Sequence, residues 1–367
     1  LVQPEEEGDA MQERFLTGFA ASDNFGFSVS SAGDVNGDGY SDLIIGAPLN
    51  DGGASNAGRA YIYYGGAIIN SGVDVILTGL TAGDQFGYSV SSAGDVNGDG
   101  FSDVIVGANL NDAGGSNAGR GYIFFGGSSM NNVADVILTG VAASDNFGTS
   151  VSTAGDVNGD GYSDVIVGAN ANDAGGSNAG RAYVYFGGSI MNNTADVLLT
   201  GEAASDGLGF AVANAGDVNG DGYGDVLIGA TGNDAGGTSA GRAYVYFGGS
   251  LMNSTADVIM TGAAANDQFG VSVSTTGDVN GDGYSDVIVG ANLNDAGGTD
   301  AGRAYIYYGG SSPDNAADLL LTGVVAGDRL GASVSTAGDV NGDGYSDVIA
   351  GAPLNDAGGA NAGRSYI

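Results

Sequence analysis

The chain has 367 residues, of which 43 are acidic and 8 are basic, so its formal net charge is −35. A surface this acidic repels nucleic acid and anionic membranes, and the absence of histidine and cysteine excludes disulfides and imidazole or thiolate metal sites. The 72 glycines follow no Gly-X-Y period and 43% of the residues are hydrophobic, which excludes collagen and disorder. No apolar run reaches the roughly 18 residues that insert across a bilayer.

One segment, Gly-Asp-Val-Asn-Gly-Asp-Gly, recurs six times at intervals of 61 residues without an insertion. Its first aspartate stands at Asp34, Asp95, Asp156, Asp217, Asp278 and Asp339. A long, regular period of this kind indicates a propeller or a solenoid, because one unit cannot bury its own faces. Composition is uniform from about residue 14, so we predict an acidic arm at residues 1–13 and a single repetitive domain over residues 14–367.

Four strand patterns follow one another in each unit, and the second unit shows them clearly. Residues 86–93 alternate small and larger side chains, as suits an inner strand near a central axis. Residues 103–108 form a continuous β-branched run, which predicts the most buried strand. Residues 120–125 form an aromatic third strand, and residues 135–139 form a fourth. The predicted fold class is therefore an all-β propeller with six four-stranded blades.

The two ends of the chain predict how the ring closes. Residues 14–18 stand where a fourth strand would, and the sequence ends inside a third strand at residues 364–367. We expect the N-terminal strand to complete the last blade and close the ring, since this would remove two open sheet edges. If further chain follows Ile367, seven blades are expected instead.

The recurring segment has the pattern of a calcium-binding loop. Positions 1, 3 and 5 of the first copy are Asp34, Asn36 and Asp38, whose side chains offer oxygen ligands. Glycine at position 6 permits a sharp turn, Tyr40 offers its backbone carbonyl at position 7, and Asp42 closes the loop at position 9. An EF-hand loop closes at position 12 and continues into a helix, so the segment predicts a hairpin loop instead.

The same five ligand positions recur in every copy. They are Asp34, Asn36, Asp38, Tyr40, Asp42, Asp95, Asn97, Asp99, Phe101, Asp103, Asp156, Asn158, Asp160, Tyr162, Asp164, Asp217, Asn219, Asp221, Tyr223, Asp225, Asp278, Asn280, Asp282, Tyr284, Asp286, Asp339, Asn341, Asp343, Tyr345 and Asp347. An ordinary Asn/Asp/Gly turn is the alternative, but six copies in fixed register favour Ca²⁺ at about six sites. Magnesium is less favoured because its smaller shell retains waters.

A Phe-Gly element precedes each loop and a Gly-Ala-Pro element follows it. Phe-Gly stands at residues 25–26, 86–87, 147–148 and 269–270, with Leu-Gly at 208–209 and 330–331. Gly-Ala-Pro stands at residues 46–48 and 351–353 and is relaxed to Gly-Ala-Asn or Gly-Ala-Thr in the other units. Together with the loops, these elements resemble the FG-GAP repeat of integrin α-subunit propellers and their bacterial relatives. The resemblance implies calcium on the hairpins between first and second strands and ligand recognition on the opposite face. Integrin propellers have seven blades, one more than the units here.

Other charged and aromatic residues repeat as well. Seventeen further acids, such as Asp84, Asp112 and Asp135, are interpreted as turn residues that bond backbone amides rather than as a functional acidic face. The repeated arginines, such as Arg120, are expected to contact a turn carbonyl or one of these aspartates. Aromatic residues near Tyr61 are expected to be core between blades rather than sugar-stacking sites.

The resemblance and the calcium loops together imply a calcium-binding recognition or adhesion module that is secreted or held at the cell surface, where millimolar calcium keeps such loops filled. Its partner is expected to be a protein or glycan on the face opposite the calcium loops. The alternative is a structural subunit that assembles with copies of itself into a surface layer or filament. A lectin is less favoured. We expect no enzyme, because a carboxylate hydrolase needs two carboxyl groups in different environments, whereas the repeated acids sit in six equivalent ones. A hydrolase activity that is lost on mutation of the unrepeated Glu202 or Asp300 would contradict this expectation.

Overall fold

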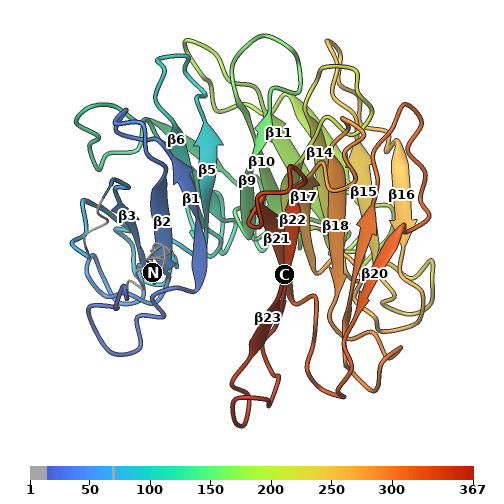
Figure 1. Cartoon of the computed structure of the whole chain (residues 1–367). Coiled ribbons are helices and arrows are strands. Elements are labelled where there is room, and N and C mark those ends of the chain that lie inside the picture. The colour runs from blue at the N-terminus through green and yellow to red at the C-terminus, as the bar shows by residue number, and fades with distance from the viewer. Residues whose placement is uncertain (1–14, 68–70) are drawn as a thin grey trace, which may run out of the picture.

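A computed structural model describes residues 15–67 and 71–367, and it confirms the all-β propeller fold. These residues form six separate sheets and no helix, so none of them forms a membrane-spanning helix. Figure 1 shows the sheets standing around a common centre in chain order. The innermost strand of each sheet packs beside that of the next, from the first blade to the sixth.

Strands within each blade are antiparallel and run in chain order from the centre outwards. The inner strands are β1 (Ser28–Gly33), β5 (Ser89–Gly94), β9 (Ser150–Gly155), β13 (Leu208–Gly216), β17 (Ser272–Gly277) and β21 (Ser333–Gly338). The second strands are β2 (Asp42–Ala47), β6 (Asp103–Ala108), β10 (Asp164–Ala169), β14 (Asp225–Ala230), β18 (Asp286–Ala291) and β22 (Asp347–Ala352). The third strands are β3 (Arg59–Tyr63), β7 (Arg120–Phe124), β11 (Arg181–Tyr185), β15 (Arg242–Tyr246), β19 (Arg303–Tyr307) and β23 (Arg364–Tyr366). The outer strands are β4 (Val75–Thr78), β8 (Val136–Thr139), β12 (Val197–Thr200), β16 (Val258–Thr261) and β20 (Leu319–Thr322).

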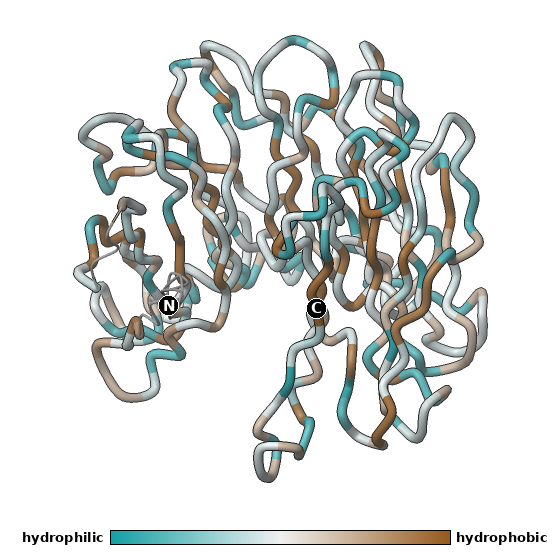
Figure 2. The backbone as a smooth tube through the Cα atoms, viewed as in Figure 1, coloured by the Kyte–Doolittle hydropathy of each residue, from teal (hydrophilic) through white to brown (hydrophobic). Residues whose placement is uncertain are grey.

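The second strand is the most buried strand of each interior blade, as its β-branched run predicts. All six residues of β6, β10, β14 and β18 are buried, because strands flank them on both sides and blades on both faces. Figure 2 shows that hydrophobic residues follow the strands, whereas hydrophilic residues gather in the connections. The register shifts between Ser92 and Gly94, and Gly94 has a φ of 74° that favours glycine. This bulge leads the chain into the Asp-rich hairpin.

The Phe-Gly element joins each blade to the one before it. Phe86 is 3% exposed, and its ring lies edge-on to Tyr122 with 5.3 Å between centroids. The Phe86 backbone also bridges Gly58, just before the third strand of the preceding blade. Gly87 has a φ of 86°, and a side chain there would overlap the carbonyl of Arg59. Glycine is therefore required for this close approach of two backbones.

The prediction that the N-terminal strand closes the ring is wrong. The last sheet has three strands, β21-β22-β23, and residues 15–18 form no strand, while residue 14 lies outside the described residues. Leu16 packs instead against the first blade, in a cluster that includes Tyr61. Phe19 stacks on Tyr61 with 5.1 Å between ring centroids. No blade of the described chain covers this face, and Leu16 and Phe19 pack against it while remaining partly exposed.

The first and last blades each keep one apolar face exposed. Val29 in β1 is 66% exposed, whereas the corresponding Val90 in β5 is 7% exposed. Val340, at the other end of the ring, is 58% exposed, whereas the corresponding Val96 is 0% exposed. Figure 1 places these faces on the blue first blade and the red last blade, which stand at the two ends of the series.

Candidate metal loops and the buried polar network

Each Asp-rich hairpin is organised around its first aspartate. In the first copy, Asp34 accepts hydrogen bonds from the backbone N–H groups of Gly37 at 2.8 Å, Asp38 at 3.1 Å and Gly39 at 2.8 Å. Asn36 Oδ1 accepts a further bond from the Asp38 N–H at 2.9 Å. Both glycines have positive φ, 76° and 87°, which lets the loop turn around the carboxylate.

The third and fifth positions face each other across this turn. Asn36 Nδ2 donates to Asp38 Oδ2 at 3.0 Å, and Asp38 Oδ1 accepts from the Tyr40 N–H at 3.0 Å. The same two contacts recur in the second to fifth loops, and the second of them recurs in the sixth. Asp38 is exposed, and Asp34 and Asn36 are half-buried. Each loop thus presents oxygen atoms at positions 1, 3 and 5 on the hairpin between the inner strand and the second strand, at one end of the blade.

The ninth-position carboxylate points into the blade. Asp42 is 0% exposed, and its oxygens accept from the N–H groups of Val35 at 2.8 Å and Gly65 at 2.7 Å. The carboxylate therefore ties the hairpin to the end of the third strand. Burial raises the pKa of the equivalent Asp103 and Asp164 to about 7, although two backbone hydrogen bonds act in the opposite direction.

The oxygen atoms of each loop are suited to a hard cation, but the ninth-position carboxylate is directed into the blade, away from positions 1, 3 and 5. Among residues 15–67 and 71–367, no group of three or more acidic residues is arranged to hold a metal ion. The ninth-position carboxylate bonds backbone amides inside the blade, and two acids and one asparagine remain in the hairpin itself. Carboxylate and amide oxygens, together with the position-7 carbonyl, are still the ligand types that Ca²⁺ prefers. The assignment of these ligands stays a prediction.

Neighbouring loops are in contact with one another. The ring of Phe101, at position 7 of the second loop, lies over Gly37 of the first loop, where a β-carbon would come 2.5 Å from its Cε1 atom. Ser102 also links the two loops: its N–H donates to the Asp34 carbonyl at 3.0 Å, and its Oγ accepts from the Asp34 N–H at 3.2 Å. Sequence reasoning missed the role of this serine, because its partner belongs to another repeat.

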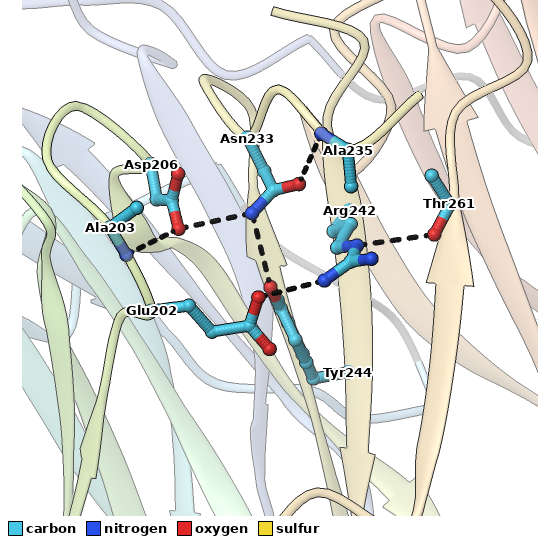
Figure 3. Close-up of polar contacts among 8 residues, drawn as sticks. All are labelled: Glu202, Ala203, Asp206, Asn233, Ala235, Arg242, Tyr244 and Thr261. Atoms are coloured by element: carbon cyan, nitrogen blue, oxygen red, sulfur yellow. Dashed lines mark hydrogen bonds and ion pairs between the residues drawn. The ribbon is translucent and has the colours of Figure 1, made fainter. Parts of the chain in front are cut away.

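On the opposite side of each blade lies a buried network built on an asparagine. In the fourth blade, Asn233 Nδ2 donates to Asp206 Oδ2 at 3.0 Å and to the Tyr244 hydroxyl at 3.4 Å (Figure 3). Asn233 Oδ1 accepts from the Ala235 N–H at 3.0 Å. Asn233 and Asp206 are buried, so this network satisfies polar groups that would otherwise be costly inside a protein. The asparagine repeats in all six units, and the sequence analysis had not singled it out.

The other repeated acids also bond backbone amides, as expected. Asp112 Oδ1 accepts from the Asn117 N–H at 2.8 Å, and Asp135 Oδ2 accepts from the Phe125 N–H at 2.8 Å. These aspartates hold turns. Tyr61 is 1% exposed, which agrees with the expected aromatic core.

The repeated arginines behave differently from the expectation. Arg242 Nε donates to Thr261 Oγ1 at 3.2 Å in the outer strand, and the same contact recurs in the second, third and fifth blades. Arg242 Nη1 also pairs with Glu202 Oε2 at 2.7 Å (Figure 3), which is the one ion pair in the part of the chain that the structure describes. The repeated aspartates are therefore not the arginines' partners, because their carboxylates already accept hydrogen bonds from asparagine side chains and backbone N–H groups.

The fold and its six Asp-rich hairpins define a repeat β-propeller. A model of the FG-GAP repeat matches residues 25–63, 86–124, 147–185, 208–246, 269–307 and 330–367. The chain belongs to the FG-GAP repeat family.

Similar proteins include several integrin α chains. Integrin alpha-5 of Xenopus laevis is 40% identical over 157 residues, which cover 40% of this chain and 14% of that protein. Integrin alpha-8 of Gallus gallus is 34% identical over 238 residues, covering 61% and 21% respectively. Integrin alpha-PS2 of Drosophila melanogaster is 33% identical over 243 residues, covering 60% and 16%. The match spans about a fifth or less of the length of these relatives.

A solved structure shares the fold at low sequence identity. The crystal structure of BBS1N in complex with ARL6DN, soaked with lead, has a TM-score of 0.52 and 11% identity, over 96% of this chain and 80% of that chain. The likeness concerns the fold alone.

Proposed function

We propose that this chain is a calcium-binding recognition or adhesion module that acts outside the cell. The observation that supports this most strongly is the set of six hairpins, each presenting Asp, Asn and Asp oxygens in one register. Family membership and similarity to integrin α chains support a role in recognition at the cell surface, with a protein or glycan as partner.

In each loop, the residues at positions 1, 3 and 5 would hold the cation. In the first loop these are Asp34, Asn36 and Asp38, with the backbone carbonyl of Tyr40 as a further ligand. Asp42 remains the predicted ninth-position ligand, since each of its oxygens accepts one backbone bond and keeps a further acceptor site. Bound calcium would offset the repulsion between carboxylates.

The test is a calcium titration of the metal-free chain by isothermal calorimetry, together with thermal melting in calcium and in excess chelator. We expect about six equivalents to bind and the melting temperature to rise by many degrees, because binding to the folded loops stabilises the chain by mass action. Asp38→Ala, which alters one loop, should remove one equivalent. A melting curve that is identical in calcium and chelator would contradict the proposal.

Self-assembly is the second candidate function, and the two exposed end faces favour it. Val29 and Val340 lie on apolar surfaces that are buried between blades elsewhere in the ring. Light scattering and electron microscopy in millimolar calcium separate the two functions. Monodisperse monomers favour recognition, whereas calcium-dependent filaments or sheets favour a structural subunit. The arm at residues 1–13 lies outside the described residues, and its deletion would test whether it contributes.

We propose no catalytic role. Glu202 is held in an ion pair with Arg242. Tyr61 and Tyr63 are buried between strands and offer no ring face to a sugar, which argues against a lectin that stacks sugars on these residues.

A further inference from the structure

A cavity of about 410 Å³ opens at the outer rim between the first and second blades. Its apolar wall includes Leu80, which follows β4, Val133, which precedes β8, and Ile137 within β8. Arg120 and Tyr122 of β7 also line it. A volume of this size is within the range of small-ligand pockets, and an apolar wall with a few polar groups is their usual lining.

The tyrosine in this cavity departs from its equivalents. Tyr122 is half-buried, whereas Tyr61, Tyr183, Tyr244 and Tyr305, which correspond to it in the other four-stranded blades, are all buried. The Tyr122 side chain is thus accessible from the cavity, whereas the equivalent tyrosines are enclosed. Burial raises the pKa of the Tyr122 hydroxyl, and the nearby Arg120 guanidinium partly offsets this effect.

The arginine in this cavity has no carboxylate partner among the described residues. Arg120 Nε donates to Thr139 Oγ1 at 3.2 Å, and no acidic oxygen lies within ion-pair distance of its guanidinium. Guanidinium groups hold five N–H donors in a planar fork that matches a carboxylate. Arg120 acts electrostatically on the Asp84 carboxylate of the same cavity but forms no ion pair with it, so its guanidinium can still pair with an anionic ligand.

The fourth blade shows how a carboxylate fits beside this arginine. Glu202 stands two repeats after Leu80, and Arg242 stands two repeats after Arg120. Glu202 Oε2 lies 2.7 Å from Arg242 Nη1 in front of Tyr244 (Figure 3). The connection from the third blade to the fourth therefore supplies a carboxylate to Arg242, whereas the connection from the first blade to the second places Leu80 beside Arg120.

One acidic residue, Asp84, lines the cavity and requires explanation. Its Oδ2 accepts a hydrogen bond from Asn111 Nδ2, so the carboxylate is already engaged. Asp206 occupies the same place in the fourth blade and is bonded to Asn233 in the same way. Because Glu202 pairs with its arginine beside Asp206, an aspartate at this position does not prevent a second carboxylate from binding.

We propose that the cavity between the first and second blades binds a carboxylate carried on an apolar body, with Arg120 pairing the carboxylate and Leu80, Val133 and Ile137 contacting the apolar part. Small organic acids and the carboxylate end of a peptide share this chemistry. The proposal deepens the recognition role given above and rests on it, but it does not depend on how many calcium ions bind.

The test measures binding of 4-phenylbutyrate and of its neutral analogue 4-phenylbutanol to the full chain by ligand-observed NMR, at constant millimolar calcium. We expect the acid to bind about tenfold more tightly or better, since a charge-assisted hydrogen bond is worth about 1.5–3 kcal/mol. Equal affinity for acid and alcohol would overturn the proposal, while the calcium titration would still stand.

Leu80→Glu gives the connection between the first and second blades the glutamate found between the third and fourth, and it should fill the cavity with a tethered carboxylate. The acid should then lose about tenfold in affinity or more, because Arg120 is already paired. Leu80 is 82% exposed, so the substitution leaves the core intact. Val141→Glu is the matched control: it places the same charge at the equivalent position of the third blade and should leave affinity within about twofold. Unchanged affinity in Leu80→Glu would exclude Arg120 as the binding group.

A tripeptide ending in phenylalanine distinguishes the two sources of the carboxylate. Binding of the peptide with a free C-terminus, and loss of binding when the C-terminus is amidated, would assign the cavity to peptide ends. Binding of 4-phenylbutyrate but of neither peptide would assign it to small organic acids.

Discussion

The interior blades and the end blades have nearly the same sequence but different surroundings. Val90 in the second blade is 7% exposed and Val29 in the first is 66% exposed, although both stand in the segment Ser-Val-Ser-Ser. Likewise, Phe101 at position 7 of the second loop covers a glycine of the preceding loop, whereas Tyr40 in the first loop is 46% exposed. The same side chain is core in one blade and surface in another.

This difference teaches that each residue's contribution depends on its neighbouring blade more than on its own. In repeat proteins, stability is approximately a sum of terms for each repeat and for each interface between repeats. A substitution at an interface should therefore destabilise an interior blade and have a much smaller effect at an uncovered face. The three predictions below compare matched positions of this kind.

The largest difference is expected at the phenylalanine of the Phe-Gly element. Phe147 is 0% exposed and packs edge-on to Tyr183 at 5.1 Å between centroids, so Phe147→Ala should lower the free energy of unfolding by about 3–5 kcal/mol. Phe25 is half-buried, and Phe25→Ala should cost about half as much or less. Urea denaturation in calcium measures both. Equal losses would mean that the first blade is covered in solution as the third blade is.

A smaller difference is expected at glycines of the Asp-rich loops. Gly98 and Gly342 both have a φ of 76°, but a β-carbon at Gly98 would come 2.5 Å from the Tyr162 ring, whereas one at Gly342 meets nothing within 4 Å. Both alanine variants should therefore be destabilised equally by backbone strain. Gly98→Ala should lower the free energy of unfolding by about 1–2 kcal/mol more than Gly342→Ala, because the Tyr162 ring must move. Denaturation at saturating calcium measures this gap, and its absence would show that the loops are not coupled.

Most of the fold could be predicted from the sequence because the same strand pattern occurs in all six units. Period, strand order and the burial of the second strand all follow from patterns within one unit, such as the β-branched run of residues 103–108. The closing strand could not be predicted in the same way. Leu16 and Phe19 are apolar enough to complete a sheet. They pack on the first blade instead because one face of that blade is left uncovered by the other blades.

In the candidate site, too, contacts within a few residues could be predicted from the sequence, whereas contacts between distant residues could not. Positions 1, 3 and 5 of each loop could be read from spacing, because their hydrogen bonds lie within a few residues. The inward direction of Asp42 could not, since one of its partners, Gly65, lies 23 residues away. Arg120 and Arg242 also look equivalent in sequence, but the residues that face them from the preceding blade differ: Glu202 forms an ion pair with Arg242, whereas Leu80 lines an open cavity beside Arg120.

The smallest difference, and the most informative about assembly, is expected at the valine of the inner strands. Val90→Thr places a hydroxyl group between two packed blades and should cost about 1–2 kcal/mol. Val29→Thr should change the free energy of unfolding by about 0.5 kcal/mol or less, because the side chain already faces solvent. Urea denaturation at two protein concentrations measures both. A loss at Val29 that grows with protein concentration would mean that a second copy covers the first blade's face, and the recognition module would then also be an assembling one.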